Sequence, residues 1–91
     1  MAPVEMTPSA YRHGFDFEEA IYAIGHPLGR QVIEDGADAR TVAYVGYPYE
    51  GSARPVELLA ELAEPRTITV FHFSDLTDNY RHLWPREEQS P

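Results

Sequence analysis

The feature of this sequence that most restricts its fold is the close spacing of turn-forming residues in the middle of the chain. Two turn-rich stretches, residues 35–38 and 48–52, interrupt this region. The β-like runs that they separate cover residues 31–34, 41–47 and 55–62. Turns this close together, between strands this short, favour antiparallel hairpins over crossover helices.

A fourth β-like run, residues 66–73, has the clearest alternation. Its β-branched and aromatic residues predict a strand with Ile68, Val70 and His72 on one face. Residues 55–63 are ambiguous, because their leucines also fit helical spacing. The neighbouring hairpins favour a strand there.

Two helical segments are predicted before the sheet. Residues 7–14 form a short helical turn that has a proline suited to its first position and ends at Gly14. A second helix follows at once, because Asp16 and Glu19 have the spacing of a capping box. It is expected to end near Gly25, ahead of a proline.

The chain is predicted to finish in another short helix, entered through residues 74–75. An apolar stripe at helical spacing supports it, and Pro85 ends it, so that residues 86–91 form a frayed tail. The members of the stripe are Leu76, Tyr80, Leu83 and Trp84.

The predicted fold is therefore a single α+β domain spanning residues 1–91, with an ordered core at about residues 7–85. It consists of two N-terminal helical segments, a four-stranded and mainly antiparallel sheet, and a short C-terminal helix. A chain of this length has room for one hydrophobic core.

The composition argues against several classes of function. The chain has a formal charge of −8, with seven arginines and no lysine. Broad coating of DNA or RNA is disfavoured, because such binding depends on neutralising phosphates. The absence of cysteine excludes disulfides and thiolate chemistry. No apolar stretch approaches the roughly 18 residues of a membrane span, and no secretion signal is recognisable, so we expect a cytoplasmic protein with no membrane partner.

Three local signatures resemble a known family. They are residues 13–20 (HGFDFEEA), residues 44–47 (YVGY) followed by Val56-Glu57-Leu58, and residues 69–72 (TVFH). In this order they are similar to the small toxins of the BrnT group in the RelE-like superfamily, and the match covers roughly residues 9–84. The resemblance implies a RelE-like fold and a ribonuclease, the toxin of a type II toxin-antitoxin pair, that a protein antitoxin holds inactive.

The chain also departs from the pattern of these relatives. Where they commonly enter the last helix with a basic pair, it has Thr77 and Asn79, and the aspartate usual after Gly46 is displaced. Two charges that would face a phosphate are missing. Two hypotheses stay open: a toxin-like, metal-independent ribonuclease, or a non-catalytic protein-binding module acting through an acidic surface with tyrosines and arginines. A homodimer formed through an uncovered sheet edge is one form of the second.

Metal-independent RNA cleavage needs a base for the ribose 2′-OH, an acid for the leaving oxygen and a cation for the phosphate. The candidate catalytic residues are His72, His13, Arg81 and Glu57. Histidine titrates near neutrality, so either imidazole suits proton transfer. Each candidate also has a structural interpretation: a packed His72, a helix-capping His13, and a solvent-facing Glu57 and Arg81.

The candidate substrate-binding residues are Arg12, Arg54, Arg66, His82 and Tyr80. Arg54 and Arg66 flank the third and fourth strands, where a guanidinium can grip a phosphate of locally bound RNA or a carboxylate of a protein partner. Tyr80 lies on the apolar stripe and is most simply a core residue with its hydroxyl at the rim. The four histidines are widely scattered, so neither a metal site nor a cofactor is predicted.

Overall fold

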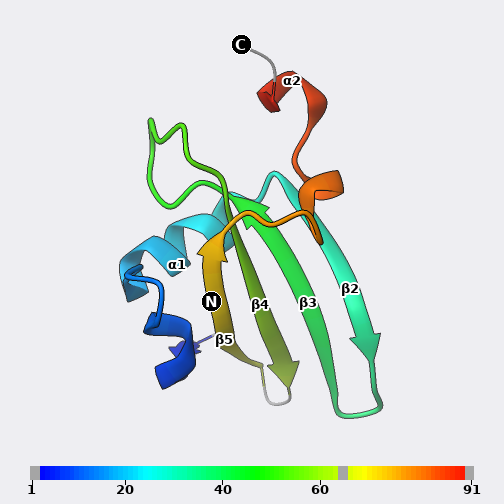
Figure 1. The fold of residues 1–91 in the computed structure, drawn as a ribbon. Coiled ribbons are helices and arrows are strands. Elements are labelled where there is room, and N and C mark those ends of the chain that lie inside the picture. The colour runs from blue at the N-terminus through cyan, green and yellow to red at the C-terminus, as the bar shows by residue number, and fades with distance from the viewer. Residues whose placement is uncertain (1–2, 64–65, 90–91) are drawn as a thin grey trace.

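A five-stranded mixed sheet forms the centre of the fold in the computed structural model, which describes residues 3–63 and 66–89 (Figure 1). The strand order is β1-β5-β4-β3-β2. The strands are β1 (Val4–Met6), β2 (Gly29–Asp35), β3 (Ala39–Gly46), β4 (Val56–Ala63) and β5 (Thr67–Asp75). The helical elements are the 3₁₀ turns η1 (Pro8–Tyr11) and η2 (Arg81–Leu83), and the α-helices α1 (Phe17–Gly25) and α2 (Arg86–Gln89).

The predicted four-stranded sheet is wrong, because β1 adds a fifth strand. β1 runs parallel to β5, with Val4 opposite Ile68 and Met6 opposite Val70. Three residues are too short to show a strand period in the sequence. What holds β1 in place is its partner: Val4 and Met6 pack against the hydrophobic core next to β5.

The prediction of two N-terminal helical segments is also wrong. Residues 8–11 form a single 3₁₀ turn, and the Thr7 side chain bonds Ser9 Oγ (2.8 Å) instead of capping it. The second segment is confirmed as α1. Its capping box is complete, since the Glu19 N–H donates to Asp16 Oδ1 and the Asp16 N–H donates to Glu19 Oε1, both at 2.8 Å.

The predicted C-terminal helix over residues 74–85 is wrong as well. β5 continues to Asp75, which lies opposite Val56, and helical structure returns only as the short turn η2. Pro85 precedes α2 instead of ending a helix: the Glu88 N–H donates to the Pro85 carbonyl (3.0 Å). Tertiary contacts of the polar residues between β5 and η2 override the weak helical period of the stripe.

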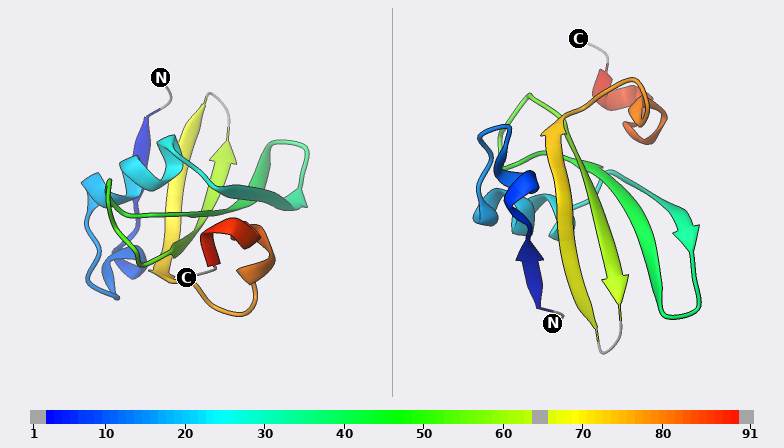
Figure 2. Two further views of the ribbon diagram at one scale, coloured as in Figure 1. Left: turned by 90° about the horizontal axis from the view of Figure 1, so that it is seen from above. Right: turned by 60° about the horizontal axis from the view of Figure 1, so that its bottom comes forward.

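The hydrophobic core lies between the sheet and α1. β4 is confirmed as a strand, and its Leu58 and Ala60 face α1 together with residues of β3 and β5. The α1 side of the core consists mainly of the small residues Ala20 and Ala23. Figure 2 shows α1 and the C-terminal segment on opposite sides of the sheet. The second face of the sheet is therefore covered only in part, by the segment that follows β5.

A β-bulge in β5 reverses the predicted direction of His72. Leu59 lies opposite His72 and Ala60 lies opposite Val70, so Phe71 is an extra residue in the ladder. Val70 and Phe73 are both fully buried in the core, and His72 points to the other face. Bulges occur often next to functional sites because they re-aim a side chain. The prediction that His72 shares a face with Val70 is wrong for this reason.

Candidate functional site

A buried carboxylate, Glu57, anchors the site on the face of the sheet opposite α1. Only 2% of Glu57 is exposed. Its Oε1 accepts the backbone N–H (2.7 Å) and the hydroxyl (2.6 Å) of Thr77, and its Oε2 accepts from His72 Nε2 (3.0 Å). An unpaired buried carboxylate would cost several kcal/mol, on the order of the desolvation of an ion. These three hydrogen bonds therefore fix the path of the chain after β5.

The hydrogen bond to Glu57 sets the tautomer of His72. A carboxylate can only accept, so Nε2 carries the proton and Nδ1 is the basic nitrogen of the neutral ring. Ser74 Oγ also lies 3.1 Å from Nε2, and the hydroxyl of Ser74 donates to the carbonyl of Asp75 (2.9 Å). About one third of the His72 side chain (33%) is exposed. Proton exchange with a substrate would therefore pass through Nδ1.

Ser74 is not a nucleophile of the Ser-His-acid kind. In such a triad the serine and the acid occupy different nitrogens of the histidine. Here Ser74 and Glu57 both approach Nε2 of His72, and the Ser74 proton is engaged by a backbone carbonyl. The arrangement supports acid-base chemistry at His72 and not acyl transfer at Ser74.

His13 lies beside His72 although the two are far apart in the sequence. Their ring centroids are 6.0 Å apart and the planes meet at 70°. The segment carrying His13 is held at the β5 edge, where the Ser9 hydroxyl donates to the Phe71 carbonyl (2.8 Å) at the bulge. Gly14, with φ of +89°, then turns the chain towards α1 in a conformation that favours glycine.

A bidentate ion pair borders the histidines. Arg54 Nη2 donates to Asp75 Oδ2 (2.7 Å), and its Nε donates to Oδ1. The Arg54 guanidinium also lies 5.4 Å from the centroid of the Phe15 ring, which stacks on Phe73. Hydrogen bonding from Arg54 lowers the pKa of the Asp75 carboxyl, and the charge of His13 lowers it further. His13 is thus within electrostatic reach of Asp75.

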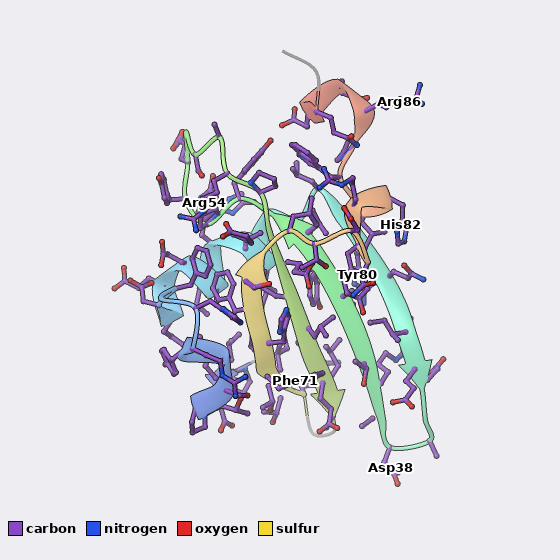
Figure 3. All side chains as sticks on the ribbon, viewed as in Figure 1. Asp38, Arg54, Phe71, Tyr80, His82 and Arg86 are labelled. Atoms are coloured by element: carbon purple, nitrogen blue, oxygen red, sulfur yellow. The ribbon has the colours of Figure 1, made fainter. Side chains whose placement is uncertain are left out.

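Two predicted site residues of the C-terminal segment, Arg81 and His82, have partners other than the two histidines. Arg81 pairs with Asp78 (3.1 Å), and His82 Nε2 bonds Gln31 Oε1 (2.7 Å) of β2. Figure 3 shows His82 beside β2 and Arg54 beside the β3–β4 loop, at different sides of the molecule. Tyr80 is half-buried near the start of η2.

Of the remaining arginines, Arg12 is exposed next to His13 in the chain. Arg66 lines a cavity of about 330 Å³ near the β2–β3 turn, together with Arg40, Leu62 and Ile68. That cavity lies at the other end of β5 from His72, since Thr67 and Ile68 begin the strand. Arg66 is therefore not part of the histidine site.

Sequence reasoning missed three residues that shape the site: Ser74, Thr77 and Asp75. All three were assigned to the beginning of a helix. In the sequence, Thr77 stood out only because it replaces a basic residue of the similar toxins. In the structure, its backbone N–H and its hydroxyl both donate to Glu57. Continuation of the polar and apolar alternation beyond Phe73 is the signal that could have extended the strand.

Within residues 3–63 and 66–89, no group of three or more His, Cys, Asp or Glu side chains is arranged to hold a metal ion. In the same part of the chain, no helix has the length and apolar character needed to cross a membrane. No family model matches the chain, and the searches of curated proteins and of solved structures likewise found no match.

Proposed function

We propose that the protein is a toxin-like, metal-independent ribonuclease that acts in the cytoplasm and is neutralised by a protein antitoxin. The observation that carries this proposal is the pair His13 and His72 at 6.0 Å, with His72 held by the buried Glu57. A pair of imidazoles supplies both proton-transfer partners that cleavage of a phosphodiester requires. The BrnT-like signatures in the sequence point to the same chemistry.

In this mechanism Nδ1 of His72 removes the proton of the ribose 2′-OH, and the resulting oxygen attacks the adjacent phosphorus. The P–O5′ bond breaks, and protonated His13 gives its proton to the leaving 5′ oxygen. Glu57 stabilises the imidazolium of His72 through the Nε2 hydrogen bond. The products are a 2′,3′-cyclic phosphate and a free 5′-hydroxyl; no water is consumed, and the proton that His72 takes up is matched by the proton that His13 releases.

The cation of this site is Arg12 in our proposal. Arg54 has a structural role instead, because its Nε and Nη2 both donate to the carboxylate of Asp75. Arg12 precedes His13 directly and is exposed, so its side chain is available to a phosphate that approaches the histidine pair. With a net charge of −8 the chain gains little from long-range attraction to RNA, so the local cation is expected to govern affinity.

The test is induction of the intact chain in a bacterial host, with growth and total RNA integrity followed together, beside His72→Ala and His13→Ala. His26→Ala is the matched control, because His26 is exposed and contacts Tyr22 away from the pair. Growth arrest with RNA decay is expected for the intact chain and the control only. Folded protein that leaves RNA intact would refute the proposal.

A purified assay separates chemistry from toxicity. A short RNA should be cleaved in the presence of EDTA to a product with a 2′,3′-cyclic phosphate, and the same substrate with a 2′-deoxyribose at the cleaved position should stay intact. Loss of cleavage in EDTA would contradict the metal-independent mechanism.

A second candidate function is a non-catalytic module that binds a protein partner. The observation in its favour is that Arg54 and Arg81 are already paired with Asp75 and Asp78. Two tyrosines contribute little to the surface that this hypothesis needs, since Tyr44 is buried and the Tyr47 hydroxyl donates to Glu88 (2.9 Å). A harmless phenotype on induction, together with a stable complex in a pull-down from the source organism, would favour this candidate.

A further inference from the structure

β2 is an edge strand whose outer side is unpaired. In the part of the chain that the structure describes, β3 is the only strand paired with it, the Gln31 side chain bonds His82, and every residue after Gly29 is exposed. The apolar side chains Val32 and Ile33, at its centre, are 40% and 43% exposed. A free edge of this kind presents backbone N–H and C=O groups that can pair with another strand.

The charges along β2 are arranged to suit an antiparallel copy of the same strand. Arg30 lies near its beginning, and Glu34 and Asp35 lie at its end. Antiparallel pairing about a two-fold axis between Val32 and Ile33 places Arg30 opposite Asp35 of the second copy. Parallel pairing in register would instead place each charge opposite its own kind, which is destabilising.

The bulge in β2 makes this pairing consistent on both faces of the sheet. Arg30 lies opposite Tyr44 and Asp35 lies opposite Arg40, and both partners point to the α1 side of β3. In a regular strand, residues 30 and 35 would point to opposite faces, because their separation is odd. The register shift between Val32 and Glu34 removes that mismatch.

The same shift matches the other face. Gln31 lies opposite Ala43 and Glu34 lies opposite Thr41, so both point away from α1. Gln31 would therefore lie opposite Glu34 of the second copy on that face, where an amide can donate to the carboxylate. Val32 and Ile33 would meet at the axis.

From this match of charge, face and register we propose that β2 pairs antiparallel with β2 of a second copy and joins the two sheets into one. The interface is short, so the dimer is transient and depends on concentration. His72 lies on β5, and β3 and β4 separate β5 from the proposed interface at β2. The histidine pair of each copy therefore stays open in the dimer. The inference does not rest on the proposed nuclease activity.

The test is sedimentation equilibrium of the intact chain from about 10 µM to about 1 mM, the range in which a small interface dissociates. The average mass is expected to rise from 10.3 kDa towards twice that value. Arg30→Glu should weaken the dimer at least about tenfold, since it replaces two attractive pairs by repulsive ones. Arg86→Glu makes the same change in net charge, but in the C-terminal helix α2 and not on β2, and should leave the affinity of the dimer unchanged (Figure 3).

A full charge reversal gives the sharpest control. With Arg30→Glu, Asp35→Arg and Arg40→Glu combined, the variant should pair with itself again, yet not with the wild-type chain in native mass spectrometry of a mixture. Asp35 and Arg40 are reversed together because they already face each other at 3.6 Å. Ile33→Lys is a second disrupting variant that leaves the ion pairs intact. Circular dichroism checks that each variant is folded.

Two outcomes would overturn the proposal. One is a wild-type chain that stays monomeric throughout the concentration range, which would leave the edge to a strand of another protein. The other is a dimer that Arg30→Glu and Arg86→Glu weaken equally, because only general repulsion between acidic chains would then be at work.

Discussion

Replacing Glu57 by glutamine should change the tautomer of His72. The oxygen of the new amide stays with the two Thr77 donors, since both of them need an acceptor at the position of Oε1. The amide nitrogen then faces Nε2 of His72, which must become an acceptor. The ring proton moves to Nδ1, and the nitrogen proposed to take the 2′-OH proton is no longer basic.

The expected magnitudes differ strongly for activity and stability. Loss of the correct histidine tautomer and of general base catalysis costs about 10²- to 10⁴-fold in kcat/KM. The free energy of unfolding should fall by only about 1 kcal/mol, because the number of hydrogen bonds at residue 57 is kept and only their charge assistance is lost. Glu57→Gln should therefore be folded and inactive.

Ring nitrogen chemical shifts from ¹⁵N NMR measure the tautomer directly. In the wild-type chain the neutral ring should show a protonated Nε2, and in Glu57→Gln a protonated Nδ1. Glu61→Gln is the matched control: it removes the same charge from the same face of β4, but Glu61 is exposed. An unprotonated Nδ1 in Glu57→Gln would refute the reasoning whether or not the protein cleaves RNA.

Three further predictions concern stability. Arg54→Met should destabilise the protein at neutral pH, because Arg54 holds the pKa of Asp75 below its usual 3.8. The stabilisation by the Arg54–Asp75 pair is present above pH 3.8 and is lost as the pH falls through the lowered pKa of the folded state. The denaturation curves of the wild-type and variant proteins should therefore converge in acid. Convergence at alkaline pH instead would show that the sign is wrong. Phe73→Ala should cost about 3–5 kcal/mol in urea denaturation, since Phe73 is fully buried and stacks on Phe15; a loss below about 1 kcal/mol would mean that the core is not packed as described. Gly29→Ala should cost about 1–3 kcal/mol and release η2 from β2, because a Cβ there collides with the backbone of Leu83, whereas Gly25→Ala has open space; equal stability of the two variants would contradict this contact.

The sequence predicted those elements correctly whose local signals agree with the contacts that they make in the folded chain. The Asp16–Glu19 capping box fixed the start of α1, and the glycine-containing turns gave the hairpins. The sequence did not predict elements whose conformation depends on a contact with a residue far away in the chain. β1 exists only against β5, and Thr77 leaves the helical pattern only because Glu57 needs its two donors.

The candidate site was predicted in part for the same reason. His13, His72 and Glu57 were named from the sequence, and the structure brings them together. The predicted face of His72 was wrong, because one extra residue at Phe71 reverses every side chain after it and leaves no mark in a single sequence. Arg81 and His82 were placed on a helix that does not form, and they pair with Asp78 and Gln31 instead.

β1 pairs with β5, which is the last strand of this sheet in chain order among the described residues. Val4–Met6 has no place in the sheet until residues 68–70 exist, and Glu57 lacks its Thr77 donors until the chain has passed beyond β5. Because contacts of such long sequence separation form late, the histidine pair cannot assemble on a nascent chain before Thr77 has emerged from the ribosome. A chain that stops before His72 has no second imidazole, so any activity of the pair begins only after β5 and Thr77 have been synthesised.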